Sequence, residues 1–395
     1  MTVLSPDTWQ ATRFGRVARI GNGADCGAVE VEEGGYPVYG SGGEFRRASS
    51  YLYDGESVLF GRKGTVDRPL YVNGRFWTVD TMYYTIIDRS RLLPRFAYYW
   101  ATTLPFGAWA TDTALPSMTA TAIKAARIDL PPLGEQRAIA DYLDRETAQI
   151  DAFIAKNEEL IALLTERRAA VIADAATGGV RQEARLVDSG VDWIGSIPAN
   201  WDVRPLRWSA RIRTGTTPSG DMVFADEPGE PWIRPDDLDV SGAASVASRW
   251  LTPEGATQGR PAVPGATLVC TIGATLGKSG RIERASYFNQ QITSVSWALN
   301  DEFLYWVFVA AREAVARLSV GNTLPILNND KLATLRIPVP PVEEQGVIVD
   351  YIRAQTTRID AAIQTAHRGV ALARERRAAL ISAAVTGKID VGVAV

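Results

Sequence analysis

The stretch PPLGEQRAIADYLDRETAQIDAFIAKNEELIALLTERRAAVIADAATG, residues 131–178, decides the architecture because it returns later in the chain. Its second copy is PPVEEQGVIVDYIRAQTTRIDAAIQTAHRGVALARERRAALISAAVTG, residues 340–387. The copies align without a gap at an offset of 209, and 23 of 48 positions are identical. Leu115-Pro116 and Leu324-Pro325 continue the match at the same offset. A period of this length indicates a duplicated domain, not a solenoid of short repeats.

Each copy predicts one long helix, which begins after a Pro-Pro pair with acids in its first turn and stops at a glycine. Residues spaced four and three apart form a seam of the coiled-coil type. In the first copy they are Ile139, Leu143, Glu146, Ile150, Phe153, Asn157, Leu160, Leu164, Arg167 and Val171. In the second copy they are Ile348, Ile352, Gln355, Ile359, Ala362, Ala366, Gly369, Ala373, Arg376 and Leu380. If the helices pair, connectivity requires them to run antiparallel and to bring the C-terminus back to the first half.

The chain is therefore expected to hold two globular α+β heads joined by two long antiparallel helices, with internal pseudo-two-fold symmetry. The expected segments are a first head at 1–130, a helix at 131–180, a lead-in with a second head at 181–338, and a helix at 339–395. Short β-like runs are expected at Ser57–Phe60, Trp77–Ile87, Thr267–Ile272 and Ile292–Ala298. Helices are expected at Arg95–Ala101 and Glu302–Leu318.

Composition excludes several classes of protein. The 395 residues are 46% hydrophobic and 22% charged, which is typical of a globular chain. The longest apolar run, Phe303 to Ala311, has nine residues and is too short for a membrane span. The first residues lack the apolar core of a signal peptide, so we expect a cytoplasmic protein. Two cysteines and one histidine argue against disulfide frameworks, zinc centres and most histidine-based triads.

Catalytic motifs are missing from the sequence. It has no Asp/Glu-x-Lys triplet of metal-dependent nucleases, no Asn/Asp-Pro-Pro-Tyr/Phe tetrapeptide of amine methylation, and no Gly-x-Gly-x-x-Gly. Gly273 to Ser279 approaches the phosphate-binding loop pattern but has three residues between its glycines where the pattern needs four. A structural or DNA-contacting glycine loop is the favoured interpretation.

The distribution of charge along the sequence restricts any DNA contact to local basic patches. The net charge is −3, and no segment is strongly basic. Basic groups nevertheless recur beside glycine-rich loops in both halves, where arginine can bind guanine or phosphate and Asn or Gln can bind adenine. The candidate DNA-contacting residues are Arg46, Arg47, Arg62, Lys63, Arg68, Lys278, Arg281, Asn289, Gln290 and Gln291. A solvated surface is the alternative for the basic groups, and a strand edge or turn is the alternative for residues 289–291.

With the two Pro-Pro-x-x-Glu-Gln helix starts in view, the chain resembles the specificity subunits of type I restriction–modification systems over nearly its whole length. Asp188 to Trp201 resembles that family's lead-in to a recognition domain, and the Gly273–Lys278 loop with Asn289-Gln290-Gln291 resembles a feature within such domains. One departure is that the first head begins almost directly at Trp9. The helix-start residues, candidate partner contacts, are Pro131, Pro132, Glu135, Gln136, Pro340, Pro341, Glu344 and Gln345.

The resemblance implies a subunit that has no catalytic residues and no cofactor of its own. Two target recognition domains would each bind one half of a bipartite, asymmetric sequence in double-stranded DNA, and the helices would set the spacing. Two modification subunits would carry S-adenosylmethionine, and restriction subunits would carry ATP-driven activity. The alternative from another class is a coiled-coil scaffold whose heads bind proteins; a self-contained enzyme is disfavoured by the missing motifs.

Overall fold

The computed structural model describes residues 9–111, 116–180, 185–220, 223–226, 229–321, 324–389 and 391. It divides into two compact units. Unit 1 comprises Met1–Glu158 with His367–Val395, and unit 2 comprises Glu159–Ala366. The boundaries of these units differ from those of the four predicted segments, because each unit contains a portion of both long helices.

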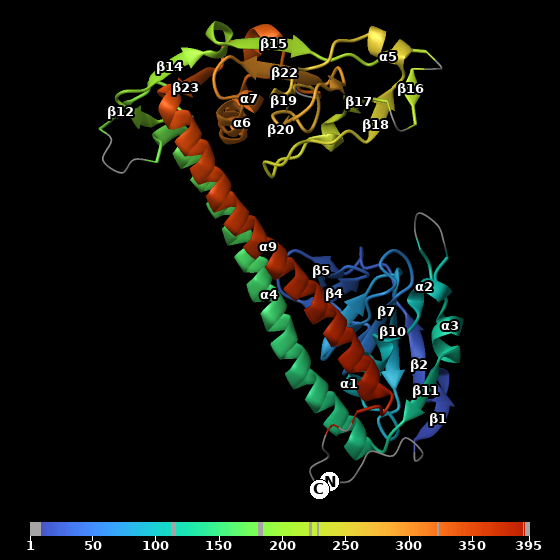
Figure 1. Ribbon diagram of the computed structural model, residues 1–395. Coiled ribbons are helices and arrows are strands. Elements are labelled where there is room, and N and C mark those ends of the chain that lie inside the picture. The colour runs from blue at the N-terminus through green and yellow to red at the C-terminus, as the bar shows by residue number, and fades with distance from the viewer. Residues whose placement is uncertain are drawn as a thin grey trace. The chain divides into compact units, whose positions relative to one another are not determined.

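Unit 1 is built from short strands and short helices, followed by the start of a long helix (Figure 1). Its elements are β1 (Gln10–Arg13), η2 (Phe14–Arg16), β2 (Ala18–Asn22), β3 (Glu30–Val31), β4 (Tyr36–Gly40), β5 (Gly43–Ala48), β6 (Tyr53–Asp54), β7 (Ser57–Gly61), β8 (Leu70–Val72), β9 (Arg75–Thr78), β10 (Met82–Ile87), α1 (Pro94–Ala101), α2 (Phe106–Trp109), α3 (Ala120–Ala125), β11 (Arg127–Leu130) and α4 (Leu133–Gly178).

Unit 2 repeats this plan, but its second sheet has four strands where that of unit 1 has five, and it ends with the start of the other long helix. Its elements are β12 (Leu186–Asp188), β13 (Ser196–Pro198), β14 (Asp202–Pro205), η3 (Leu206–Trp208), β15 (Ala210–Thr214), β16 (Phe224–Ala225), β17 (Glu230–Ile233), η4 (Pro235–Asp237), β18 (Arg249–Leu251), α5 (Pro253–Thr257), β19 (Thr267–Cys270), β20 (Ser279–Arg281), β21 (Tyr287–Phe288), β22 (Ile292–Trp297), α6 (Asp301–Ala310), α7 (Arg312–Arg317), α8 (Asn329–Leu332), β23 (Arg336–Val339) and α9 (Val342–Val385).

The sheets of the two units share one topology. A four-stranded sheet has the order β2-β10-β7-β8 in unit 1 and β15-β22-β19-β20 in unit 2. A second sheet in each unit contains a parallel pair, β4 with β9 and β17 with β21. The strand that precedes each long helix pairs antiparallel with a strand from the early part of its unit, β11 with β1 and β23 with β14. The α+β duplication predicted from the sequence is confirmed.

Two expected elements are divided in the structure. The run Trp77–Ile87 is expected to be continuous, but a turn at residues 80–81 separates β9 from β10, which belong to different sheets. The expected helix Glu302–Leu318 is α6 and α7, because Ala311 has φ −82° and ψ 6° and interrupts the helical backbone. The remaining expected runs correspond to β7, β19, β22 and α1.

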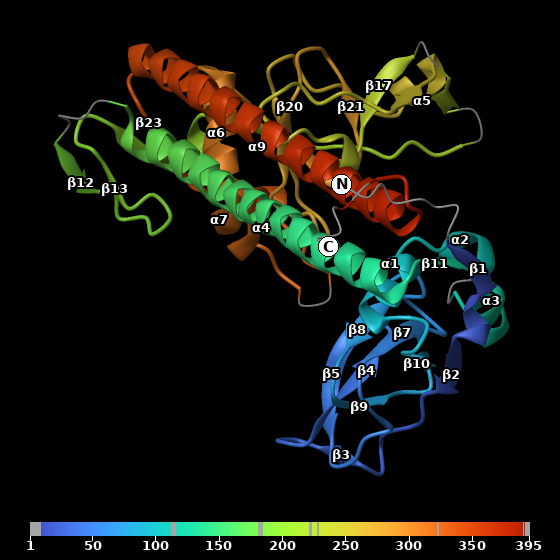
Figure 2. The same cartoon turned by 90° about the horizontal axis from the view of Figure 1, so that it is seen from below.

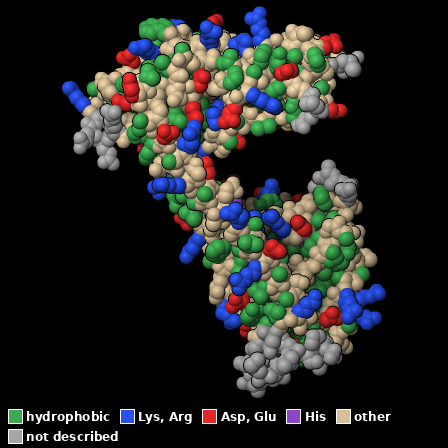
Figure 3. Space-filling view, viewed as in Figure 1, with side chains coloured by type: hydrophobic (Ala, Val, Ile, Leu, Met, Phe, Trp, Pro, Cys, Tyr) green, Lys and Arg blue, Asp and Glu red, His purple; other side chains and the backbone are tan. Residues whose placement is uncertain are grey.

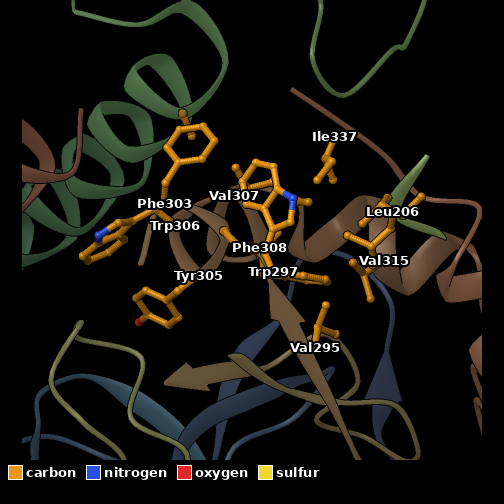
Figure 4. Packing of buried hydrophobic residues seen from close by; sticks show 14 of the residues in the cluster. Leu206, Val295, Trp297, Phe303, Tyr305, Trp306, Val307, Phe308, Val315 and Ile337 are labelled. Atoms are coloured by element: carbon orange, nitrogen blue, oxygen red, sulfur yellow. The ribbon is translucent and has the colours of Figure 1, made fainter. Parts of the chain in front are cut away.

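Each unit has its own core, closed by both long helices. In unit 2 the core joins α6 to β22 and includes Ile172 from α4 and Ile352 from α9. Figure 4 shows aromatic residues of α6, Phe303 and Phe308 among them, gathered near Val295 and Trp297 of β22. In unit 1 the core includes Leu143 from α4 and, from α9, Ile381 with its neighbours. The end of α9 thus packs in the same unit as the start of α4, as the duplication predicts.

The long helices lie side by side in Figures 1 and 2 and pair antiparallel within each unit. In unit 1, Arg377 of α9 donates to Asp151 of α4 at 2.8 Å. In unit 2, Arg168 of α4 donates to Asp360 of α9 at 2.9 Å. Both partners of the second pair correspond to those of the first at the offset of 209, so the duplication has produced the same interhelical ion pair twice.

The inward stripe of each helix departs from the predicted seam. The less exposed positions of α4 are 139, 143, 147, 150, 154, 157, 161, 164, 168, 172 and 175, and those of α9 lie at the same positions plus 209. Ten steps span 36 residues, which is the 3.6-residue period of a straight helix and not the 3.5 of a heptad. The predicted seam members Phe153, Leu160 and Arg167 are therefore exposed, although the Phe153 ring still lies beside Gly369 of α9.

Candidate nucleic-acid interface

The glutamine of each Pro-Pro-x-x-Glu-Gln motif is fully buried, and its hydrogen bonds connect the start of the helix to its own unit. Gln136 accepts from the amide of Leu93 at 2.8 Å and donates from Nε2 to the carbonyls of Arg91 and Pro131 at 2.9 Å. Gln345 accepts from the amide of Asn300 at 3.1 Å and donates to the carbonyl of Pro340 at 3.0 Å. Neither side chain can reach a partner protein while it makes these bonds.

The glutamate of each motif binds the tryptophan that immediately precedes β1 or β14. The indole Nε1 of Trp9 donates to Glu135 at 2.9 Å, and that of Trp201 donates to Glu344 at 3.0 Å. These bonds lie beside the antiparallel pairs of β1 with β11 and of β14 with β23. The sequence suggests partner contact for these residues, whereas the geometry gives them an internal role.

The two prolines of each motif stand just before the helix. Pro131 and Pro340 are buried, and the carbonyls of Pro132 and Pro341 accept bonds from the first turn. Pro132 is exposed and Pro341 half-buried, so these two remain the motif prolines with surface available to a partner.

In unit 1, Arg46 and Arg47 lie on strand β5 and are engaged by nearby acids. Arg46 donates to Glu30 at 2.5 Å, and Arg47 lies 3.7 Å from Glu44 and donates to the carbonyl of Gly35 at 3.2 Å. All four charged side chains are at least 39% exposed, and surface pairs of this kind contribute about 0–1 kcal/mol. A phosphate can displace these carboxylates at little cost.

The second basic group of unit 1 follows β7. Arg62 is half-buried, its guanidinium 6.0 Å from the ring centre of Tyr83. Lys63 and Arg68 are exposed, and neither forms an ion pair with another residue in the described part of the chain. These two are the candidates with donors most available to DNA.

The candidates in unit 2 are less available. The ammonium of Lys278 donates to the carbonyl of Pro235 at 2.9 Å. Arg281, with 18% of its side chain exposed, donates to the carbonyl of Gly242 at 3.1 Å and to Glu283 at 3.0 Å. These bonds connect β20 and the residue before it to neighbouring loops, which favours a structural role for both side chains.

Residues 289–291 connect β21 to β22 in a tight turn. Asn289 accepts through Oδ1 from the amide of Gln291 at 2.7 Å, as an asparagine does when it stabilises a turn. Asn289 and Gln291 are half-buried, and Gln290 is exposed. Of the three amides, that of Gln290 is the most accessible to a base edge.

The glycine loops are held by equivalent bonds in the two units. The amide of Gly64 donates to the carbonyl of Pro116 at 3.0 Å, and that of Gly273 donates to the carbonyl of Pro325 at 3.0 Å. Gly277 donates to the carbonyl of Cys270 at 2.8 Å. Because these amides bond within the protein, they do not form a phosphate cradle. Leu115, part of the aligned Leu-Pro pair, lies outside the described residues.

Charges do not form a single basic field. On the face shown in Figure 3, Lys and Arg side chains are interspersed with Asp and Glu. Among the described residues no group of three or more His, Cys, Asp or Glu side chains is arranged to hold a metal ion. In the same part of the chain, every helix is too short or too polar to cross a bilayer.

Two exposed leucines belong to none of the motifs in the sequence. Leu163 of α4 and Leu372 of α9 are 55% and 65% exposed, and they occupy the same position in the two repeats. Leu372 lines a groove of about 400 Å³ in unit 1 together with Phe153 and Gly369. Their identity at the offset of 209, outside the predicted seam, is the signal in the sequence that could have found them.

Comparison with known proteins identifies the family. A family model described as the type I restriction modification DNA specificity domain matches residues 6–162 and 198–365. A Haemophilus influenzae protein provisionally named as a type I restriction enzyme specificity subunit is 25% identical over 331 residues, 81% of this chain and 80% of that protein. The EcoDI specificity subunit of Escherichia coli is 20% identical over 413 residues, 97% of this chain and 89% of that subunit.

Solved structures share the fold. One, from work on complex assembly and conformational transition of the type I R-M system, has a TM-score of 0.68 at 17% identity and is matched over 96% of this chain and 98% of its own. The HsdS subunit from Thermoanaerobacter tengcongensis has a TM-score of 0.51 at 16% identity, over 97% and 98%. Since the family model spans both repeats, the chain belongs to the type I restriction modification DNA specificity family.

Proposed function

We propose that this chain is the DNA-recognition subunit of a type I restriction–modification complex. Each unit would bind one half of a bipartite, asymmetric target in double-stranded DNA, and the helices would set the spacing and dock two modification subunits. Restriction subunits would join the same complex.

The observation that carries the proposal is that the duplicated units keep one interior and differ in their loops. The Gln–Pro, Glu–Trp and Arg–Asp bonds recur in both. The candidate contact residues do not: Arg68 lies free of ion pairs with described residues in unit 1, while Lys278 of unit 2 is bound to a carbonyl. Two units of one fold with different surfaces suit two different half-sites.

Two equivalent docking positions support the expected stoichiometry. Leu163 lies in unit 2 and Leu372 in unit 1, at the same place in the repeat. In unit 1 the groove beside Leu372 suits the apolar face of another helix, and Leu163 presents the same exposed side chain in unit 2. One modification subunit at each leucine gives two per chain.

The chemistry would belong to the partners. S-adenosylmethionine would be bound by the modification subunits and ATP by the restriction subunits, so this chain would contribute no catalytic residue and no cofactor. A subunit that selects chromosomal sites for its partner subunits would work in the cytoplasm.

A binding experiment tests the proposal. The chain is combined with its modification subunits, and gel shift is measured on a duplex that carries the motif methylated in the host genome and on a scrambled duplex. We expect a retarded band with the motif at concentrations that leave the scrambled duplex free. Equal binding of both duplexes would favour the alternative, a scaffold whose units bind proteins.

A further inference from the structure

A basic cavity of about 510 Å³ lies on the four-stranded sheet of unit 2. Its lining includes Arg211 and Arg213 of β15 and Ser294 and Ser296 of β22. The antiparallel register places Arg211 opposite Ser296 and Arg213 opposite Ser294. Alternate residues of a strand share one face, so two guanidinium groups and two hydroxyl groups line the same cavity.

The two arginines are positioned without being neutralised. Arg213 is half-buried and donates to the carbonyl of Pro261. Its guanidinium carbon lies 5.8 Å from the ring centre of Phe288. Arg211 is exposed. Neither arginine forms an ion pair with a residue in the described ranges. Elsewhere in unit 2, arginines such as Arg204 and Arg281 do have carboxylate partners.

One carboxyl group, that of Asp301, also lines the cavity. Its Oδ1 accepts from the amide of Trp297 at 2.8 Å, and burial raises the pKa of this carboxyl above its ordinary value. Two guanidinium groups against one carboxylate leave the lining with a positive charge. Hydroxyl and guanidinium donors are the groups that bind phosphate oxygens.

Unit 1 has a different surface at the equivalent place. In the matching strands, Gly21 and Tyr84 stand where unit 2 has Arg213 and Ser294. The exposed Arg19 stands where unit 2 has the exposed Arg211, and Ile86 stands where it has Ser296. A Cβ atom on Gly21 would lie 2.3 Å from Cζ of Tyr84, so the tyrosine ring covers this face of the sheet. The duplication has therefore kept the strands and the exposed arginine, but has replaced the half-buried arginine and its serine partner by a glycine and an aromatic side chain.

We propose that the Arg211–Arg213 cavity is a phosphate site and that its ligand is a backbone phosphate of DNA bound by unit 2. This rests on the proposed function and adds an anchor that the glycine and tyrosine of unit 1 cannot supply. The half-buried Arg213 with the serine hydroxyls would hold one phosphate, while the exposed Arg211 would contact the strand as it continues over the surface. Phosphate contacts fix the register of a protein on the duplex without selecting bases.

The test uses the full chain with its modification subunits. Affinity for the motif duplex is measured at salt concentrations from about 50 to about 200 mM for the wild type, R211Q/R213Q and the transplant R213G/S294Y. The matched control is R284Q, since Arg284 is exposed in the same unit, outside the cavity, and without an ion pair to a described residue. A separate arm measures protection from thermal unfolding by inorganic phosphate against chloride at equal ionic strength.

We expect the slope of log affinity against log salt to become shallower by about 0.9 for each phosphate that a cavity variant no longer binds. We expect no change in R284Q or in the methylated motif. An unchanged slope in the variants, with the wild type still preferring its motif, would overturn the phosphate site and leave the proposed function standing. Protection by inorganic phosphate with an unchanged slope would assign the cavity to a free phosphate compound and overturn the DNA source. A wild type that does not prefer its motif would overturn the proposed function itself.

Discussion

Replacing either exposed leucine by glutamate is expected to remove one modification subunit and leave the other. Leu163 and Leu372 are 55% and 65% exposed, so more than half of each side chain is available for burial. Full burial of a leucine contributes about 1.5–3 kcal/mol, and these fractions leave about 1–2 kcal/mol for the contact. A buried unpaired carboxylate adds a penalty of several kcal/mol. A total of about 3 kcal/mol or more weakens that contact by about 100-fold.

Native mass spectrometry of the mixed subunits measures the stoichiometry directly. The wild type is expected to bind two modification subunits, L163E and L372E one each, and the double variant none. Ala162 and Ala371 are exposed and are also related by the offset of 209, so A162E and A371E control for added charge on the same helices. Two bound subunits at unchanged affinity in both leucine variants would refute the docking positions.

Two further predictions concern residues within the units. Q136A should destabilise unit 1 more than Q345A destabilises unit 2, because Gln136 makes three side-chain hydrogen bonds and Gln345 two, each contributing about 0.5–1.5 kcal/mol. Hydrogen exchange should become faster at the Leu93 amide in Q136A and at the Asn300 amide in Q345A. Unchanged exchange at both amides would contradict the prediction. K63A/R68A should weaken DNA binding and reduce the slope of log affinity against log salt by about two. K278A should lower the melting temperature and change DNA affinity less, because Lys278 is bonded within the unit. The opposite pattern in salt titrations and thermal melts would show that Lys278 contacts DNA.

The sequence predicts the large-scale organisation because the two copies of the repeat can be compared with each other. Twenty-three identical positions mark the helices, and a return of the C-terminus to the first unit follows from connectivity. The finer helix geometry is predicted less well. A heptad drifts by about 20° per repeat from a straight helix. The predicted seam therefore matches the inward stripe at five positions, 139, 143, 150, 157 and 164, and is one residue out at 147, 154, 161, 168 and 172.

The helix-start motif shows why side-chain roles are harder to predict. The family resemblance makes Gln136 and Gln345 candidate partner contacts, yet both are buried against carbonyls of neighbouring turns. The tryptophans at positions 9 and 201 are visible in the sequence as the openings of the two halves. Their bonds to Glu135 and Glu344 depend on long-range strand pairing that no local pattern encodes.

The central claim is that each unit selects one half of the target. The most direct measurement is a map of methylated adenines in a host whose chain carries residues 1–130 from a relative with a different target. The account predicts a bipartite motif in which one half-site changes and the other is retained. A motif in which both halves change together, or a map identical to the wild type, would contradict it.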